Sequence, residues 1–188
     1  MQIQGYFDLR FEAVRDAFSE LFVRTQQRGA AVCVKVGGET VVDLWAGVAD
    51  NAGEQAWQSD TLVNLFSCTK TFTAVAALQL VAEGKLQLDE PVARVWPEFG
   101  VNGKQDITLR QLLSHQAGLP AVRQPLPPEA LYDWETMAAA LAAETPWWTP
   151  GEGHGYAAIT YGWLLGELIR RADGREPGEA IVARTARP

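Results

Sequence analysis

The sequence is short of the residues on which several classes of protein depend. Its 188 residues include 2 Cys and 2 His, too few for a four-ligand zinc site without several carboxylates, so we expect no metal and no cofactor. Two Cys also exclude a disulfide scaffold, and Cys33 and Cys68 are expected to remain thiols. Basic residues number 16 against 23 acidic ones, a net charge of −7. Such an acidic chain offers no electrostatic footprint for nucleic acid or for anionic lipid.

Long hydrophobic runs and export signals are missing too. The first residues lack a basic segment followed by an apolar one. The longest apolar stretch, near residues 74–82, is interrupted by Gln79. It falls far short of the ~20 residues that cross a bilayer. We therefore expect a cytoplasmic protein without a membrane segment.

What the sequence does hold is core material: 47% of its residues are apolar, with 7 Trp and 7 Phe. This length fits one domain or two small ones. The spacing of apolar residues and the capping signals predict about six helices, over roughly 8–27, 66–83, 108–114, 134–141 and 161–173 and from Pro177 onward. Residues 120–128 and 147–155 are predicted loops. The pair Thr108 and Gln111 forms a capping box.

The β-structure predicted from the sequence is a single hairpin. Residues 31–36 and 40–45 are β-rich and flank Gly37-Gly38. An isolated hairpin is marginally stable, and the remaining sequence suggests no further strand. We therefore expect the sheet of this chain to be incomplete.

A Ser-x-x-Lys tetrapeptide, Ser67 to Lys70, opens the predicted helix over 66–83. Residues three apart share a helix face, so the Lys70 amine can reach the Ser67 hydroxyl. Burial and the helix N-terminus favour the neutral amine that a base requires, and first-turn N–H groups can stabilise an oxyanion. A capping role for Ser67, with Lys70 extending into solvent, fits the same residues. Chance gives such a tetrapeptide in roughly one chain in twelve of this composition, so the residues alone leave both interpretations open.

A Gly-rich segment over residues 147–155 precedes Tyr156. Its G-x-G-x-G spacing, with no strand before it, does not fit a phosphate or dinucleotide loop. In this segment Trp148 fits either the wall of an acyl pocket or a loop anchor. His115 and His154 have no evident Asp partner, so we interpret them as loop or capping residues and predict no Ser-His-Asp triad.

Four segments, in order along the chain, resemble the serine β-lactamase and penicillin-binding-protein superfamily in its class C-like branch, and are most similar to family VIII carboxylesterases. Residues 65–72 match the nucleophile motif, and residues 84–92 match the GKL-LDDPV stretch. Residues 107–120 match the ITIRHLLTHTSGLP stretch, and residues 148–166 match the PG-x-x-x-Y-S-N-x-G-Y stretch. The resemblance covers roughly the N-terminal half of the family's length.

The resemblance implies an α/β (α+β) fold of the β-lactamase/transpeptidase type, with an antiparallel sheet and flanking helices packed against a mostly helical domain. Residues 1–85 would belong to the sheet domain, including the nucleophile helix, and residues 86–188 to the helical domain.

The resemblance also implies roles for six residues. Ser67 would be the acylated nucleophile, Lys70 would activate it, and Tyr156 would be the second general base and acid. The substrate-binding residues would be Trp148, Gly155 and Ala158, with Gly155 also positioning the tyrosine.

Two departures from the family pattern shape the functional prediction. Ala158 replaces the Asn that contacts the amide side chain of a β-lactam, which favours small esters. The family's third motif, on a late strand, lies outside the similarity. We therefore predict a serine hydrolase that cleaves small carboxylic esters through an acyl-enzyme on Ser67. The alternatives are β-lactamase, D-alanyl carboxypeptidase or acyltransferase activity, or an inactive half-chain whose sheet a second polypeptide, the C-terminal half or another copy, must complete.

Overall fold

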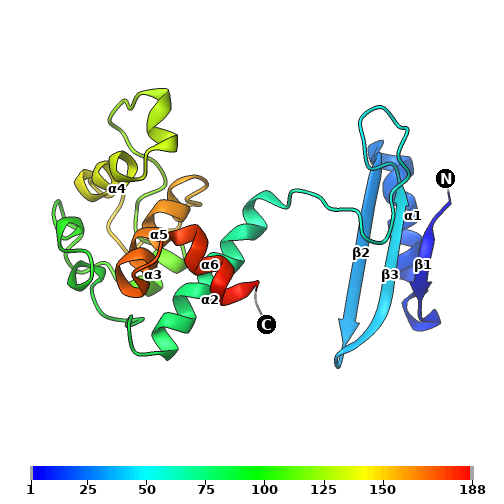
Figure 1. Cartoon of the computed structure of the whole chain (residues 1–188), viewed down its shortest axis with the longest axis horizontal. Coiled ribbons are helices and arrows are strands. Elements are labelled where there is room, and N and C mark those ends of the chain that lie inside the picture. Colours follow the sequence, from blue (N-terminus) through cyan, green and yellow to red (C-terminus); the bar gives the residue numbers. More distant parts are fainter. Residues whose placement is uncertain (1, 187–188) are drawn as a thin grey trace. The chain divides into compact units, whose positions relative to one another are not determined.

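The computed structural model describes residues 2–186, and the chain forms two compact units. The sheet unit runs from Met1 to Asn64, and the helical unit runs from Leu65 to Pro188. Figure 1 shows the strands in the first unit, coloured blue to cyan, whereas the second unit consists of helices and loops. The division falls before the expected domain boundary at residue 85, because the helix that follows Ser67 packs against the last two helices of the chain.

The sheet unit is built on the predicted hairpin. Strands β2 (Gly29–Val36) and β3 (Glu39–Gly47) pair antiparallel. Gly37 and Gly38 connect them with φ of 58° and 87°. A two-residue hairpin turn of this hand needs positive φ at both positions, which glycine adopts without steric cost. The prediction of a hairpin around this Gly pair is therefore confirmed.

A third strand, β1 (Gln4–Phe7), pairs antiparallel with β3, giving the strand order β1-β3-β2. The expectation that the sequence holds no strand beyond the hairpin is therefore wrong. Gly5 lies opposite Leu44 in this pairing with φ of 106°. A Cβ at Gly5 would lie 2.0 Å from the Asp43 carbonyl oxygen, so only glycine allows the two backbones to approach this closely.

Helix α1 (Glu12–Thr25) contacts strand β3. It follows a 3-10 turn over Leu9–Phe11, whose first N–H groups are capped by Asp8. The predicted helix over residues 8–27 is thus confirmed, with a tighter first turn. The core of the sheet unit consists of five buried apolar side chains, which are Phe18, Val41, Val42, Leu44 and Ala46.

The helical unit is organised around α2 (Thr69–Ala82), which contacts α5 (Thr160–Asp173) and α6 (Pro177–Thr185). A 3-10 turn over Phe66–Cys68 precedes α2, so the helix predicted over 66–83 is confirmed with an altered first turn. Small side chains at Ala76 and Ala77 are fully buried. They allow the neighbouring helices to approach α2 closely.

Shorter elements complete the helical unit. They are α3 (Leu109–Leu113), α4 (Trp134–Ala143) and the 3-10 turns Val92–Arg94, Pro97–Phe99 and Pro128–Tyr132. The capping box at the start of α3 is confirmed, because Thr108 Oγ1 accepts the Gln111 N–H at 3.2 Å and Gln111 Oε1 accepts the Thr108 N–H at 3.0 Å. Gly174 ends α5 with φ of 80°, and Pro177 opens α6, as predicted.

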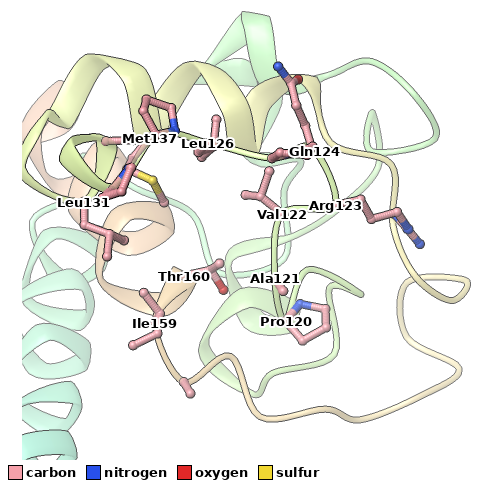
Figure 2. Close-up of a pocket in the computed structure, with 15 residues that line it drawn as sticks. Pro120, Ala121, Val122, Arg123, Gln124, Leu126, Leu131, Met137, Ile159 and Thr160 are labelled. Carbon is pink, nitrogen blue, oxygen red and sulfur yellow. The ribbon is translucent and has the colours of Figure 1, made fainter.

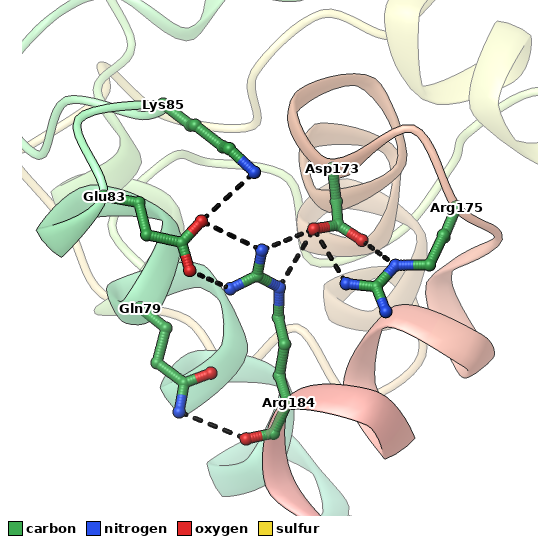
Figure 3. A network of polar contacts seen from close by, with 6 residues as sticks. All are labelled: Gln79, Glu83, Lys85, Asp173, Arg175 and Arg184. Atoms are coloured by element: carbon green, nitrogen blue, oxygen red, sulfur yellow. Dashed lines mark hydrogen bonds and ion pairs between the residues drawn. The ribbon is translucent and has the colours of Figure 1, made fainter.

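A polar network joins the end of the chain to α2 and α5 (Figure 3). The Arg184 guanidinium donates to Glu83 Oε1 at 2.6 Å and to Asp173 Oδ1 at 3.1 Å. Arg175 donates to the same Asp173 carboxylate, and Gln79 Nε2 donates to the Arg184 carbonyl at 3.1 Å. The Asp173 side chain is only 2% exposed. Hydrogen bonds from Arg175, and then from Arg184, lower the pKa of Asp173 to about 2.

Candidate active site

Ser67 and Lys70 lie on one face of the turn that begins α2. Ser67 belongs to the 3-10 turn, and Lys70 is the second residue of the helix. The Lys70 amine donates to Ser67 Oγ at 3.2 Å and to the Ala158 carbonyl oxygen at 2.8 Å. Lys70 is therefore held inward by two hydrogen bonds. Cys68, and not Ser67, occupies the N-cap position of α2, and it makes no side-chain hydrogen bond there. The interpretation of Ser67 as the N-cap is therefore not supported.

Tyr156 completes this cluster from a loop that precedes α5. Its side chain is about half exposed, and its ring centroid lies 5.0 Å from Lys70 Nζ. A hydrogen bond with Ser67, followed by one with Lys70, lowers the pKa of the Tyr156 phenol from its ordinary value of 10.0. A lowered phenol pKa increases the share of phenolate near neutral pH, which is the form that accepts a proton. The structure thus brings together the three residues that the sequence singled out.

The backbone just before Ser67 is strained. Phe66 has φ of 45°, in the left-handed region, although its side chain is large and 77% exposed. A bulky residue in this region is a genuine outlier, and such strain costs roughly 1–3 kcal/mol. The strained residue directly precedes Ser67, so the direction of the Ser67 side chain depends on an unfavourable backbone conformation.

Trp148 lies under the Gly-rich loop. A Cβ at Gly155 would lie 2.4 Å from its Cη2 atom, and a Cβ at Gly153 would lie 2.7 Å from its Cδ1 atom. The indole therefore occupies the space that side chains at these two positions would need. This placement favours Trp148 as a loop anchor over the wall of an acyl pocket. It also gives Gly155 a structural reason, because the loop that carries Tyr156 crosses the indole at van der Waals distance.

Ala158 links the cluster to an apolar cavity of about 470 Å³. The cavity lies between the Pro-rich loop over residues 120–128 and the start of α5, and Leu126, Met137 and Ile159 face it from different elements (Figure 2). Cavities of this size and character are typical of small-molecule sites. Ala158 lines the cavity, and its carbonyl oxygen accepts the hydrogen bond from Lys70. The cavity therefore adjoins the cluster of Ser67, Lys70 and Tyr156.

His115 is the residue whose place in the site the sequence did not reveal. Its ring centroid lies 5.0 Å from that of Tyr156 and 6.0 Å from that of His154. The sequence places it 41 residues before Tyr156, in a segment interpreted as a helix end. The signal that could have found it is its position inside the matched stretch 107–120.

The sequence led us to expect free cysteines, no membrane segment and no metal site, and the residues that the structure describes bear on each of these. Cys33 and Cys68 are both exposed and free. Between residues 2 and 186, no helix combines the length and the hydropathy that crossing a bilayer requires. In the same range, no group of three or more His, Cys, Asp and Glu side chains is arranged to hold a metal ion.

Residues 14–188 match the family model described as Beta-lactamase. Because this match takes in most of the chain, the chain belongs to the beta-lactamase family. It is 38% identical over 175 residues to the esterase/beta-lactamase LipL of Mycobacterium tuberculosis, covering 93% of this chain and 40% of LipL. It is 32% identical over 177 residues to the esterase EstB of Burkholderia gladioli, covering 85% of this chain and 45% of EstB.

Solved structures show the same relationship. A family VIII carboxylesterase superposes with a TM-score of 0.89 at 40% identity, covering 100% of this chain and 52% of that one. A penicillin-binding-protein homologue from Caulobacter crescentus superposes with a TM-score of 0.90 at 42% identity, covering 98% and 50%. The expected β-lactamase/transpeptidase-like fold is therefore confirmed. The chain spans about half the length of these proteins.

Proposed function

We propose that this chain carries the nucleophile of a serine hydrolase that cleaves small carboxylic esters, together with the tyrosine that transfers its proton and the lysine that assists this transfer. The observation that carries the proposal is the convergence of Lys70 and Tyr156 on the hydroxyl of Ser67. A serine is a weak nucleophile until a base takes its proton, and here two groups with that capacity contact it. The relatives named as esterases support the same reaction class.

The reaction proceeds in two halves. Tyr156, as phenolate, accepts the Ser67 proton while Oγ forms a bond to the ester carbonyl carbon, and Lys70 stabilises the phenolate. The tetrahedral intermediate then breaks its bond to the alcohol oxygen, which takes the proton from Tyr156. Water attacks the acyl-enzyme, gives its proton to Tyr156, and Ser67 recovers that proton as the acid departs.

The expected contribution of the first turn to an oxyanion site needs refinement. The N–H of Cys68 donates to the Leu65 carbonyl at 3.1 Å, and the N–H of Thr69 donates to the carbonyl of Phe66. Both groups are therefore used inside the turn. We expect the N–H of Ser67 itself to donate to the oxyanion from this turn.

The substrate is a small ester with an apolar group beside Ala158. The cavity next to Ala158 is lined largely by Pro, Ala, Val, Leu, Met and Ile side chains, which suit an acyl or alcohol chain. Ala158 offers no amide to a β-lactam side chain. The β-lactamase alternative stays open because the name of LipL joins esterase with beta-lactamase. D-alanyl carboxypeptidase and acyltransferase activity use the same acyl-enzyme chemistry.

We also propose that further polypeptide, as another segment or another copy, covers α2 and extends the sheet. Phe72, Val75 and Leu78 lie on one face of α2 at three-residue spacing and are 49%, 41% and 45% exposed. Strands β1 and β2 are the edges of the three-stranded sheet, and free edges favour pairing. Native mass spectrometry of the purified chain tests this proposal: a larger assembly supports it, and a strictly monomeric, fully active chain contradicts it.

A fluorophosphonate probe followed by peptide mapping tests the nucleophile. We expect the label on the peptide that contains Ser67, and no label on that peptide after Ser67→Ala. In an assembly with esterase activity, Ser67→Ala lowers kcat on p-nitrophenyl butyrate by at least ~10³. Cys68→Ala is the matched control, because it alters the adjacent exposed residue and leaves labelling intact. A Ser67→Ala variant that keeps its label or most of its activity overturns the assignment.

A further inference from the structure

His115 accepts hydrogen bonds from the N–H groups of the two residues that flank Tyr156. The Gly155 N–H donates to the His115 carbonyl oxygen at 3.1 Å. The Ala157 N–H donates to the His115 ring nitrogen Nδ1 at 3.2 Å. One residue therefore holds the chain immediately before and immediately after the tyrosine. Two anchors of this kind fix the direction in which the Tyr156 side chain leaves the backbone.

His115 is itself fixed on several sides. Its ring stacks on the buried Tyr161 ring of α5 with a centroid distance of 4.8 Å and an angle of 29°. Its own N–H donates to the Leu112 carbonyl at 3.2 Å. Its φ of 59° lies in the left-handed region, which costs energy for any residue other than glycine and is least costly for Asn and Asp among the rest. The ring stacking, the hydrogen bond and the left-handed backbone together give His115 one defined orientation in the loop.

The contact with Ala157 defines the protonation state of the ring. Because Nδ1 accepts a hydrogen bond, the proton of the neutral imidazole lies on Nε2. The imidazolium has donors at both nitrogens, so protonation removes the acceptor. The titratable groups whose rings face His115 are Tyr161 from α5 and His154 and Tyr156 from the loop, and the charge of Lys70 from α2 also acts on it. Burial first, and then the charges of His154 and Lys70, lower the pKa of His115 below 6.5.

We propose that neutral His115 is the positioning residue that holds Tyr156 against Ser67 and Lys70. It touches no reacting atom and acts through the N–H groups of Gly155 and Ala157, the residues on either side of the tyrosine. The proposal rests on the proposed role of Tyr156 in proton transfer. One consequence is a loss of turnover in acid, when the ring is protonated and the Ala157 N–H loses its acceptor.

Two substitutions that tolerate the left-handed backbone separate the acceptor from the backbone conformation. His115→Asn places Oδ1 the same number of bonds from Cα as Nδ1, so it keeps an acceptor and removes the titration. His115→Gly keeps the backbone free of strain but removes the acceptor and the ring. His154→Asn is the control, since it alters the other histidine of the chain. Each variant is made in the full chain, in whatever assembly it forms.

The first measurement is independent of turnover. The four tyrosines are titrated by carbon NMR of their ring carbons, with Tyr156 assigned by Tyr156→Phe. We expect His115→Gly to raise the pKa of Tyr156 toward its ordinary 10.0, because the phenol moves away from Ser67 and Lys70. We expect His115→Asn and His154→Asn to leave it lowered. A Tyr156 titration unchanged in His115→Gly overturns the proposal, whether or not the chain hydrolyses esters.

The second measurement is the kinetics of p-nitrophenyl butyrate hydrolysis against pH. We expect His115→Gly to lower kcat by about 10- to 100-fold with KM nearly unchanged, as misplacement of a catalytic group does. His115→Asn should restore kcat to within a few-fold and abolish the acid limb due to the histidine. Equal loss in both variants contradicts the proposal. Absence of any activity and any labelling at Ser67 rejects the proposed function instead, and leaves the tyrosine titration to judge the role of His115.

Discussion

The two units differ in how each buries its own apolar residues. Among the residues that the structure describes, 22 buried apolar side chains of the helical unit form one cluster, whereas the corresponding cluster of the sheet unit has 5. The helical cluster includes residues from α2, α4 and α5, and α5 contacts each of the other helices of the unit. The sheet unit has one helix and three strands, and its buried residues come from α1 and β3.

The difference shows where the geometry of the site is determined. Ser67, Lys70 and Tyr156 all belong to the helical unit, and His115 and Trp148, which support the tyrosine loop, belong to it as well. A well-packed unit therefore holds every contact described for the cluster. The hydrogen bonds described around Ser67 are formed within the helical unit, and the following predictions address the packing, the ion pairs and the site of the two units one by one.

The same substitution in both cores gives the largest expected effect. Leu165 and Leu44 are 0% and 2% exposed, and each is changed to Ala in turn. Removing a buried leucine costs about 2–5 kcal/mol, with the cost increasing as the cavity fails to collapse. We expect Leu165→Ala near the upper end and Leu44→Ala near the lower end. Hydrogen exchange of peptides from each unit measures the two losses. Equal losses would mean that the two cores pack equally well.

Alanine substitutions at Gly155 and Gly162, both in the helical unit, are expected to change stability in opposite directions. A Cβ at Gly155 would lie 2.4 Å from the Trp148 ring, whereas one at Gly162 in α5 meets no atom within 4 Å. We expect Gly155→Ala to cost about 1–3 kcal/mol by overpacking. Gly162→Ala should stabilise α5 by up to about 1 kcal/mol. Thermal unfolding of both variants checks the signs, and a neutral Gly155→Ala would refute the close contact with Trp148.

Acid titration compares one carboxylate from each unit. Hydrogen-bonded arginine partners lower the pKa values of both Asp173 and Asp8 to about 2, but their side chains are 2% and 27% exposed. A lowered carboxyl pKa gives stability that is complete above the unfolded value near 3.8 and is lost as the pH falls through about 2. For Asp173 this amounts to about 2 kcal/mol.

We therefore expect Asp173→Asn to reduce the loss of stability that the helical unit shows between pH 4 and pH 2 by up to about 2 kcal/mol. Asp8→Asn is the control, and its effect should be smaller because Arg10, its partner, is 73% exposed. Urea unfolding at a series of pH values measures both. An unchanged pH dependence in Asp173→Asn would contradict the role assigned to the network around Arg184.

Ala158 gives the smallest expected effect, on substrate preference alone. Ala158→Asn supplies an amide at the position where the β-lactamase-like pattern has one. A hydrogen bond of this kind contributes about 0.5–1.5 kcal/mol net, which raises nitrocefin turnover by up to about tenfold. Turnover of p-nitrophenyl butyrate should change little. Ala158→Leu, similar in size but without an amide, is the control, and an equal gain in that variant would exclude the hydrogen bond as the cause.

Local signals in the sequence predicted most of the fold. The Gly37-Gly38 turn, the capping box at Thr108 and the stop at Gly174 each act over a few residues, so their structural outcome follows from the sequence nearby. Strand β1 was missed because Gln4–Phe7 is only four residues long, contains a glycine and is largely exposed. Its strand conformation depends on pairing with β3, some forty residues away, which no local pattern records.

In the candidate site, too, contacts between neighbours in the sequence could be predicted and contacts between distant residues could not. Ser67 and Lys70 are three residues apart, so helix geometry allowed them to meet, although an N-cap role for Ser67 with Lys70 extending into solvent fitted the same residues. Tyr156 was indicated by the resemblance to a known family, because its approach to Ser67 spans 89 positions of the chain. His115 was interpreted as a loop or capping residue, since the N–H groups that it binds belong to a loop 40 residues later. Contacts made by packing, rather than by spacing, were beyond what the sequence could show.

The left-handed backbone of Phe66 bears on how this sequence would respond to selection. A population screened only for thermal resistance or yield should accumulate Phe66→Gly and Phe66→Asn, because both relieve the strained φ of 45°. The same changes would free the turn that aims Ser67, so a population screened for turnover should reject them. At residue 66, selection for stability and selection for activity would then favour different amino acids.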